Sequence, residues 1–461
     1  MQIELNYPRE LFDESSLKKE LIYKLITKHQ KHARELKKLK EYYLGKHDIL
    51  KHQRRSGKPN FKTVCNHAKD IADTSTGYFM GNTIKYNNTV KGDIDSLLMA
   101  FDNADVDEAD SENAINMAVY GRSYEYIYVK EGENELGVRT LEPEHTFIVL
   151  DDSIEKNPLF AVYYYQIKNA ENDQVTYRAE ILTENLHYSV IFKGDNADKI
   201  MPDPEEHNLG AIPIIEYRNN IFSIGDFEQQ INLIDAYNSL MGNRVNDKEQ
   251  AIESILTIYG ASLADTPEEA KEAMQILCEE GLLELPADAK AEFLKNMLEE
   301  ASVEVLRKAL KEDIYTFSHV PNLTDKEFAG NTSGVAMEFK LLGLEMITKT
   351  KEKHYVKALR QRIKIFAYYY NLTQIYDNAK SIVPQFSRGL PKNLLELSQI
   401  IANLKDKVSL RQLISLLPFV EDPDAEIEAL EEERREQEPM FSQNTAYKEP
   451  VDEEEGLLDE T

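Results

Sequence analysis

Cysteine and tryptophan are nearly absent from this 461-residue chain, which has two cysteines and no tryptophan. Cys65 and Cys278 are far apart in the sequence and too few to form a disulfide framework or a zinc motif by themselves. We interpret them as two buried thiols of a protein that stays in a reducing compartment.

Long apolar runs are also missing. No stretch approaches the roughly eighteen consecutive apolar residues of a transmembrane helix. The first twenty residues include Glu4, Arg9, Glu10 and Asp13, which a secretory signal would not contain. With 42% apolar and 30% charged residues, the composition is typical of a soluble globular protein, and the length predicts roughly two to four domains.

Catalytic and metal-binding motifs are missing too: HExxH, CxxC and GxSxG do not occur. Residues 132–137 have the glycine spacing of a P-loop, but no lysine follows to reach a phosphate, and we interpret them as a hairpin turn. His29 and His32 lie three residues apart on a predicted helix and could share a metal, but an exposed basic face is the preferred interpretation. The residues therefore predict no enzyme, no cofactor and no metal site, and favour a structural or interaction protein.

Positive charge is scarce, with 54 Lys and Arg against 82 Asp and Glu, and a net charge of −28. Residues 421–461 contain 17 acidic and three basic residues, whereas residues 17–62 contain 15 basic and four acidic ones. Such asymmetry is typical of interaction tails or of nucleic-acid contact. Because phosphate binding needs clustered cations, so acidic a chain is not expected to grip DNA tightly, but DNA could slide past it.

The apolar periodicity of the first half predicts two helices followed by a β-rich region. Residues 14–44 and 64–80 have helical spacing, and Gly45 ends the first helix. From Thr83 to Tyr217 the period changes to two, which predicts a mainly antiparallel α+β domain. Its expected elements are strands around Tyr124–Tyr128, at 160–168, 175–182 and 186–193, a short helix at 108–119, and a last strand at 212–217. Pro213 predicts that this last strand lies near a sheet edge.

The second half is predicted to be mainly helical. Two long helices, 226–256 and 287–317, bracket a small insert at 257–286, and a polar loop at 318–333 leads to a helix over 334–372. From Val335 the apolar residues form a stripe with helical steps of three and four: Phe339, Leu342, Met346, Val356, Leu359, Ile363, Phe366 and Tyr370. This stripe lapses at Lys349 and Lys353, which predicts that the helix passes from one packing environment to another.

The last part is predicted to hold a strand at 382–386, helices at 393–402 and 410–417, and a charged helix capped by Asp422. Beyond Pro439 we expect disorder.

Several stretches resemble the portal protein family of tailed bacteriophages, in its siphophage branch. They are Tyr42–His47, Asp73–Gly81, Leu233–Asn238, Asp313–Tyr315, Phe328–Ala336, Lys340–Leu344 and Pro391–Glu396. Each alone would be weak, but their order and spacing cover residues 40 to 425.

The resemblance implies an α+β, mainly helical portal-type fold and a dodecameric ring with a central channel. Its parts would be a wing (1–225), a helical stem (226–256 and 287–317), a clip (257–286), a tunnel loop (318–333), a long wing helix with a returning strand (334–392), a helical crown (393–425) and a partly disordered acidic tail (426–461).

The resemblance also implies site residues. The tunnel loop would line the channel with Asn322, Thr324, Asp325, Lys326, Glu327, Phe328 and Asn331. The clip would dock other proteins through Tyr259, Ala261, Leu263, Glu268 and Leu282. Lys326 would offer one cation per subunit to the DNA phosphates, although a solvated lysine is an equal alternative.

The implied function is a channel at one capsid vertex, through which terminase packages double-stranded DNA that is later ejected. The implied partners are further copies of the chain, non-specifically passing DNA, the terminase large subunit, head-completion, major capsid and scaffolding proteins, and no membrane. The implied location is the virion, and the host cytoplasm during assembly. Two alternatives remain open: a nuclease or ATPase subunit of the packaging machine, and a non-viral helical adaptor.

Overall fold

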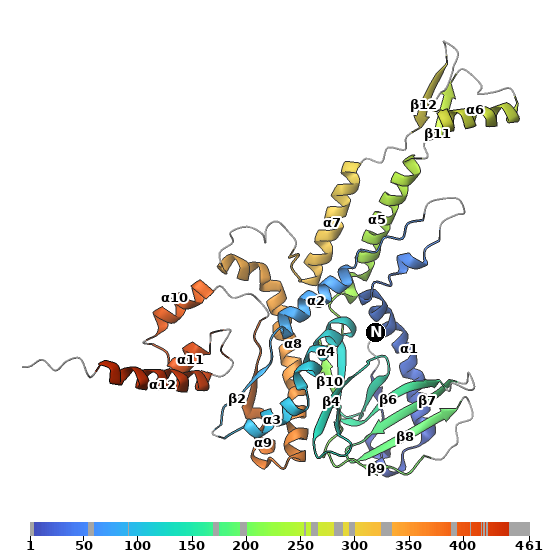
Figure 1. The fold of residues 1–461 in the computed structure, drawn as a ribbon. Helices are drawn as coiled ribbons and strands as arrows, with labels where there is room; N and C mark the ends of the chain where they lie inside the picture. Colours follow the sequence, from blue (N-terminus) through green and yellow to red (C-terminus); the bar gives the residue numbers. More distant parts are fainter. Residues whose placement is uncertain are drawn as a thin grey trace, which may run out of the picture. The chain divides into compact units, whose positions relative to one another are not determined.

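A computed structural model gives the fold of the chain in two compact units, residues 1–389 and 390–461. Figure 1 shows the course of the chain through them. The residues that the structure describes are 4–53, 60–90, 92–168, 175–193, 201–252, 255–259, 266–280, 289–294, 300–323, 334–388, 394–405, 407–415, 417, 420 and 423–441.

A six-stranded sheet forms the core of the β-rich region, in the order β1-β5-β6-β7-β8-β9. The strands are β1 (Leu5–Asn6), β5 (Thr146–Leu150), β6 (Pro158–Lys168), β7 (Val175–Leu182), β8 (Leu186–Lys193) and β9 (Glu205–Glu206). Helix α1 (Lys19–Tyr43) packs on it through Ile22, Leu25 and Ile26. All neighbouring strands are antiparallel except β1 and β5, so the predicted antiparallel region is confirmed. The helix begins at Lys19, because Glu14–Ser16 form a 3-10 turn.

A three-stranded sheet lies beside it, in the order β10-β3-β4. Its strands are β3 (Arg122–Val129), β4 (Leu136–Leu141) and β10 (Ile214–Arg218). Strand β10 is at an edge, as Pro213 predicted. Gly132, with a φ of 79°, lies in the turn between β3 and β4, which confirms the hairpin interpretation of the glycine spacing.

The next three α-helices along the chain pack beside the sheets. They are α2 (His67–Met80), α3 (Asp95–Asn103) and α4 (Val106–Tyr120). The sequence predicted α2 and α4 but not α3, whose nine residues carry one apolar turn. Strand β2 (Lys85–Asn88) pairs antiparallel with β13 (Ile382–Gln385), which joins distant parts of the chain.

Helices α5 (Ile231–Ile252) and α7 (Glu300–Ser318) run side by side and bracket the insert (Figure 1). The insert holds β11 (Ile255–Tyr259), α6 (Pro267–Glu280) and β12 (Lys290–Leu294), and its two strands pair antiparallel. The predicted helix over 287–317 is therefore wrong over 290–294, and the insert extends from 255 to 294 rather than from 257 to 286. Residues 290–294 read Lys-Ala-Glu-Phe-Leu, a sequence with helical propensity. Pairing with β11 makes it a strand instead, because tertiary context overrides local propensity.

Helix α8 (Gly334–Tyr369) has 36 residues and crosses the first unit (Figure 1). Its core residues are Leu341, Leu344, Tyr355, Leu359, Ile363 and Phe366, which pack against α2, α3 and β10. The predicted helix is confirmed. In its first half Phe339, Leu342 and Met346 are 73%, 51% and 64% exposed, because the buried Leu341 and Leu344 lie on the opposite side of the helix.

Residues 370–388 complete the first unit with α9 (Thr373–Asp377) and β13. The described residues of the second unit form α10 (Leu394–Leu404), α11 (Leu410–Ile414) and α12 (Pro423–Phe441). The predicted charged helix after Asp422 is confirmed as α12, which extends across residues 425 and 426 to Phe441. The predicted disorder beyond that helix falls on residues outside those that the structure describes.

Across the described helices, no segment is long and apolar enough to cross a membrane.

Candidate functional site

The polar loop after α7 is anchored at its first residues. His319 ends α7 in the left-handed region, with a φ of 58°, and Val320 is buried in the cluster that contains Leu341 and Leu344 of α8. A left-handed residue turns the chain sharply at a helix end, at a cost that the burial of Val320 offsets.

Among the predicted loop residues the structure describes Asn322, which is half-buried. Thr324, Asp325, Lys326, Glu327, Phe328 and Asn331 lie outside the described residues.

The predicted docking residues of the insert are partly described. Tyr259, the last residue of β11, is 54% exposed, and Glu268 is exposed in the first turn of α6. Ala261, Leu263 and Leu282 lie outside the described residues. An exposed tyrosine at the end of a hairpin suits a protein contact, because its ring offers apolar area and its hydroxyl a hydrogen bond.

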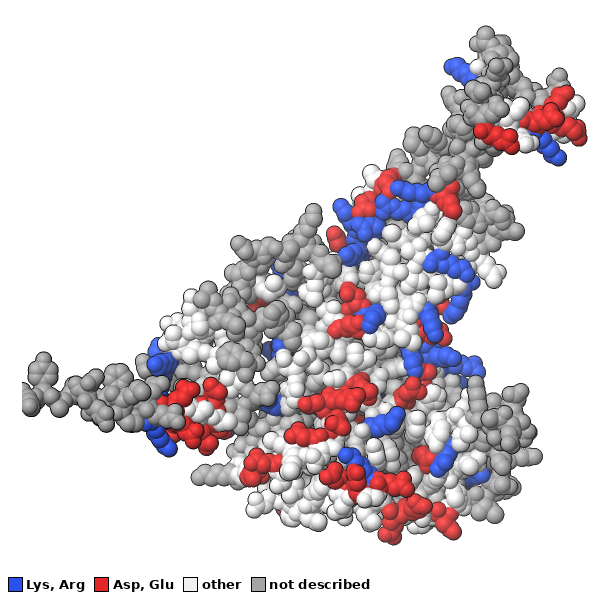
Figure 2. Space-filling model, viewed as in Figure 1, with Lys and Arg blue, Asp and Glu red and all other residues white. Residues whose placement is uncertain are grey.

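Ion pairs and a hydrogen bond connect α5 to α7. Arg244 of α5 contacts Glu300 and, at 3.1 Å, Glu304 of α7. Arg307 of α7 binds Glu304 at 2.6 Å and donates to the hydroxyl of Tyr237 on α5 at 3.2 Å. Hydrogen bonds from Arg307 and Arg244 lower the pKa of Glu304 to about 2. Figure 2 shows basic and acidic side chains mixed where the two helices approach the insert.

Buried aromatic and polar groups fix the C-terminal end of α7. The hydroxyl of Tyr315 on α7 donates to Asp70 of α2 at 2.5 Å and lies 3.2 Å from Nδ1 of His67. Burial and the nearby Lys311 lower the pKa of His67. Burial and the bond to Asp70 raise the pKa of Tyr315. Both groups therefore stay uncharged near neutral pH, and α7 is held against α2.

A buried lysine attaches α8 to the segment that precedes α5. Nζ of Lys351, whose side chain is 5% exposed, lies 2.5 Å from Oδ2 of Asp226 and 2.6 Å from Oγ of Ser75. Asn219 donates to the other carboxylate oxygen of Asp226 at 2.8 Å. The backbone N–H of Asp226 donates to the carbonyl of Ala118 at 2.7 Å. This cluster therefore ties four segments of the first unit together.

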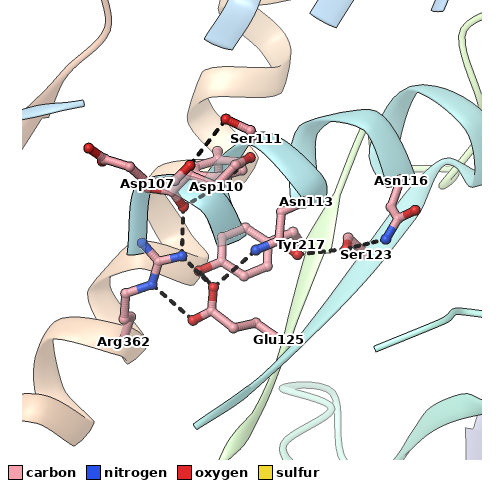
Figure 3. A network of polar contacts seen from close by, with 10 residues as sticks. Asp107, Asp110, Ser111, Asn113, Asn116, Ser123, Glu125, Tyr217 and Arg362 are labelled. Carbon is pink, nitrogen blue, oxygen red and sulfur yellow. Dashed lines mark hydrogen bonds and ion pairs between the residues drawn. The ribbon is translucent and has the colours of Figure 1, made fainter. Parts of the chain in front are cut away.

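A second buried cation fastens α8 to α4 and β3 (Figure 3). Arg362 is fully buried; Nη2 lies 2.6 Å from Oδ1 of Asp110, and Nε donates to Oε1 of Glu125 at 2.9 Å. Glu125 also accepts from Tyr217 and Asn113, at 3.1 and 3.0 Å. Burial alone would lower the pKa of Arg362, but the carboxylates of Asp110 and Glu125 outweigh it and raise that pKa well above its usual value.

Neither buried cation was predicted from the sequence. Lys351 lies between Lys349 and Lys353, both exposed, and Arg362 lies two residues from the exposed Arg360. The available signal was their spacing, since Leu344, Lys351, Tyr355 and Arg362 share one side of the helix. A cation that shares the helical spacing of buried apolar residues suggests burial. This signal is weak here, because α8 contains six other Lys and Arg residues.

The predicted metal-binding alternative for His29 and His32 has no support in the described residues, where no group of three or more His, Cys, Asp or Glu could hold a metal. Nδ1 of His29 lies 2.8 Å from the hydroxyl of Tyr164 on β6. Burial, followed by the neighbouring His32, Arg122 and His145, lowers the pKa of His29 to about 3. Both histidines are buried, so the exposed basic face expected for them is also wrong.

A cleft of about 1410 Å³ lies between α8, β10 and the N-terminal segment. Its lining includes the apolar Ile212 and Ile214, at and just before the start of β10, and Lys357 and Lys364 of α8. The lining carries charges of both signs.

Three comparisons with known proteins bear on these features. The sequence model of a family described as "Phage portal protein, SPP1 Gp6-like" matches residues 22–440. Two curated proteins named "Portal protein" are similar over most of their length. That of Bacillus phage SPP1 is 24% identical over 443 residues, which cover 90% of this chain and 86% of the relative. That of Clostridium phage phiCD119 is 22% identical over 442 residues, covering 90% and 96%.

Solved structures of gene transfer agent particles are more distantly similar. A chain in the neck of the native particle, computed with C12 symmetry, gives a TM-score of 0.45 at 10% identity, covering 77% of this chain and 88% of that one. A chain in the native virion gives 0.43 at 9% identity, covering 76% and 87%.

Proposed function

The chain belongs to the SPP1 Gp6-like family of phage portal proteins, and we propose that its copies form a ring at one capsid vertex, through which double-stranded DNA is packaged and later ejected. The observation that carries this proposal is the order of parts: a helix pair with an insert, then a polar loop, then a 36-residue helix. This order lies within residues 22–440, which the family model matches, and it supports the assignment of these parts to a portal ring.

In this proposal the α5–α7 pair forms the wall of the channel. The two helices are joined by the ion pair of Arg244 with Glu304 and by the hydrogen bond from Arg307 to Tyr237, and the Tyr315 cluster fixes the end of α7 against α2. A channel must guide a polyanion without binding it tightly, so a wall of mixed charge in an acidic chain suits the task better than a basic groove.

The loop at 318–333 would contact the DNA, and α8 would transmit the load to the body of the subunit. Support comes from the anchoring of α8 at Lys351 and Arg362, since a buried ion pair resists displacement more than an exposed one. Among the loop residues, we propose Lys326 as the cation that meets phosphates.

The partners would dock at the insert. We propose that the hairpin β11–β12 and α6, with Tyr259 and Glu268 exposed, bind first the terminase large subunit and then the head-completion proteins. Capsid and scaffolding proteins would contact the outer part of the first unit. The role is structural, at the portal vertex of the virion, after assembly in the host cytoplasm.

Negative-stain electron microscopy of the purified chain tests the proposal directly. We expect ring particles with a central hole. A strictly monomeric species at every concentration would contradict the ring. ATP or DNA hydrolysis by the pure chain would instead favour a packaging enzyme.

The loop has its own test. Deleting Asp325–Phe328 should leave rings intact and impair DNA packaging into procapsids. Replacing the same four residues by Gly and Ser is the matched control for length: it should impair packaging too if the side chains contact DNA. Loss of ring assembly on deletion would show that the loop is structural.

A further inference from the structure

Helix α8 has an exposed face that runs along its whole length and changes character halfway. In the first half it presents an apolar row, Phe339, Leu342 and Met346, all more than half exposed. In the second half it presents a basic row, Lys353, Lys357, Arg360 and Lys364, all exposed. The steps of three and four residues put both rows on one side of the helix. The apparent lapse of the apolar stripe at Lys349 and Lys353 is therefore the border between the two rows.

The basic row has no counter-charge of its own. None of its four residues makes an ion pair with another described residue, and Lys364 only lies over the ring of Tyr376, at 5.8 Å from its centroid. Lys357 and Lys364 also line the cleft described above. Four unpaired cations on one face are unusual in a chain with a net charge of −28.

The same chain carries a matching acidic row on α4. Asp105 precedes the helix, and Glu108 and Glu112 lie one turn apart on it; all three are exposed and make no ion pair with described residues. Figure 2 shows acidic side chains gathered over the region of α3 and α4.

The buried ion pair between Arg362 and Asp110 shows on which sides of α8 and α4 the basic row and the acidic row lie. At about 100° per residue, Lys353, Lys357, Arg360 and Lys364 lie on the side of α8 opposite Arg362. Glu108 and Glu112 lie on the side of α4 opposite Asp110. Because Arg362 and Asp110 face each other across the two helices, the basic row and the acidic row point away from each other, toward opposite faces of the subunit.

We propose that the outward face of α8 in one copy docks on the acidic row of α4 in the next copy, an inference that rests on the proposed ring. Two complementary patches on opposite faces make a head-to-tail contact, which is the kind of contact that closes rings. Charge pairing sets the register and opposes the repulsion between copies that each carry a net −28. The apolar row adds burial to the same contact.

Charge reversal tests the contact. Lys353→Glu with Lys357→Glu should raise the protein concentration for half-assembly by about a hundredfold or more, because like charges then meet across the interface. Glu108→Lys with Glu112→Lys should do the same from the other side. Assembly is measured by light scattering after size exclusion and by electron microscopy. The matched control is Lys24→Glu with Lys28→Glu, an equally spaced exposed pair on α1 with no ion pair to a described residue, which should form normal rings.

Mixing the two reversed variants separates a lost contact from a lost fold. Each variant keeps one native face and carries one reversed face, so neither assembles alone, but an equimolar mixture should form rings of alternating subunits. Combining all four substitutions in one chain should also restore assembly.

Rings formed by either reversed variant alone, or no assembly in the mixture, would overturn this inference and leave the proposed function standing. A wild-type chain that never forms rings would overturn both.

Discussion

The ion pairs of α8 and those of the α5–α7 pair join the same kinds of side chain, a cation and a carboxylate. The former are buried and the latter lie at the surface. Lys351 and Arg362 are buried with their carboxylates, whereas Arg244, Arg307, Glu300 and Glu304 lie at the surface of the helix pair. Buried pairs are costly to form but specify one arrangement, and exposed pairs are weak and adjustable. The difference teaches that α8 is held in one position, whereas the contacts between α5 and α7 can be rearranged at little cost.

Breaking the Arg362 cluster should have the largest effect. Arg362→Met leaves Asp110 and Glu125 buried without a cation and should destabilise the first unit by about 3–5 kcal/mol. Chemical denaturation followed by circular dichroism measures it. Arg360→Met, two residues away and exposed, is the control and should change the midpoint little. Adding Asp110→Asn and Glu125→Gln should recover part of the loss; a loss that stays the same would show that packing, not charge, stabilises the site.

Removing the carboxylate beside Lys351 should come next. Asp226→Asn leaves the buried ammonium of Lys351 without its carboxylate, so we expect the free energy of unfolding to fall by about 3 kcal/mol. The same denaturation experiment measures it, and adding Lys351→Met should recover part of the loss. A loss that the second substitution leaves unchanged would contradict this account.

Buried His29 should make stability depend on pH. Its pKa is 6.5 unfolded and about 3 folded, so the unfolded state binds the extra proton and stability falls as the pH drops from 6.5 toward 3. One such group contributes about 1.4 kcal/mol per pH unit in that window. His29→Phe should remove this share of the slope in denaturation measured at several pH values. An unchanged slope would mean that His32, His67 and His207, whose pKa values burial also lowers, carry the effect.

Cutting an exposed pair should have the smallest effect. Arg307→Met removes the contacts to Glu304 and Tyr237 at the surface of the α5–α7 pair, and water and salt already screen them. We expect the denaturation midpoint to stay close to that of the wild type. A loss as large as that of Arg362→Met would remove the distinction between the two regions.

The sequence predicted regular elements better than the partners of single side chains. Strands 175–182 and 186–193 were predicted with the observed bounds, and α8 nearly so, because their apolar periods are strong. Strand β12 was missed because its partner β11 is some thirty residues away, and a pattern within 290–294 does not contain that pairing.

The sequence did not predict which side chains of the site are buried and which are exposed. Phe339 looks like a core residue and Lys351 like a surface one, and the structure reverses both. Helical spacing says which residues share a face, but not which face is covered. Covering depends on α2, α3 and β10, which come from distant parts of the chain.

The two buried cations also limit how the length of α8 can change. Lys351 and Arg362 are eleven residues apart, about three full turns, and each meets carboxylates from a different segment. One residue inserted between them would rotate one cation by about 100° away from its partners. Related chains can therefore lengthen this stretch only by numbers of residues that return both cations to the same side of the helix. The helix thus sets the angle between its two attachment points as well as the distance between them.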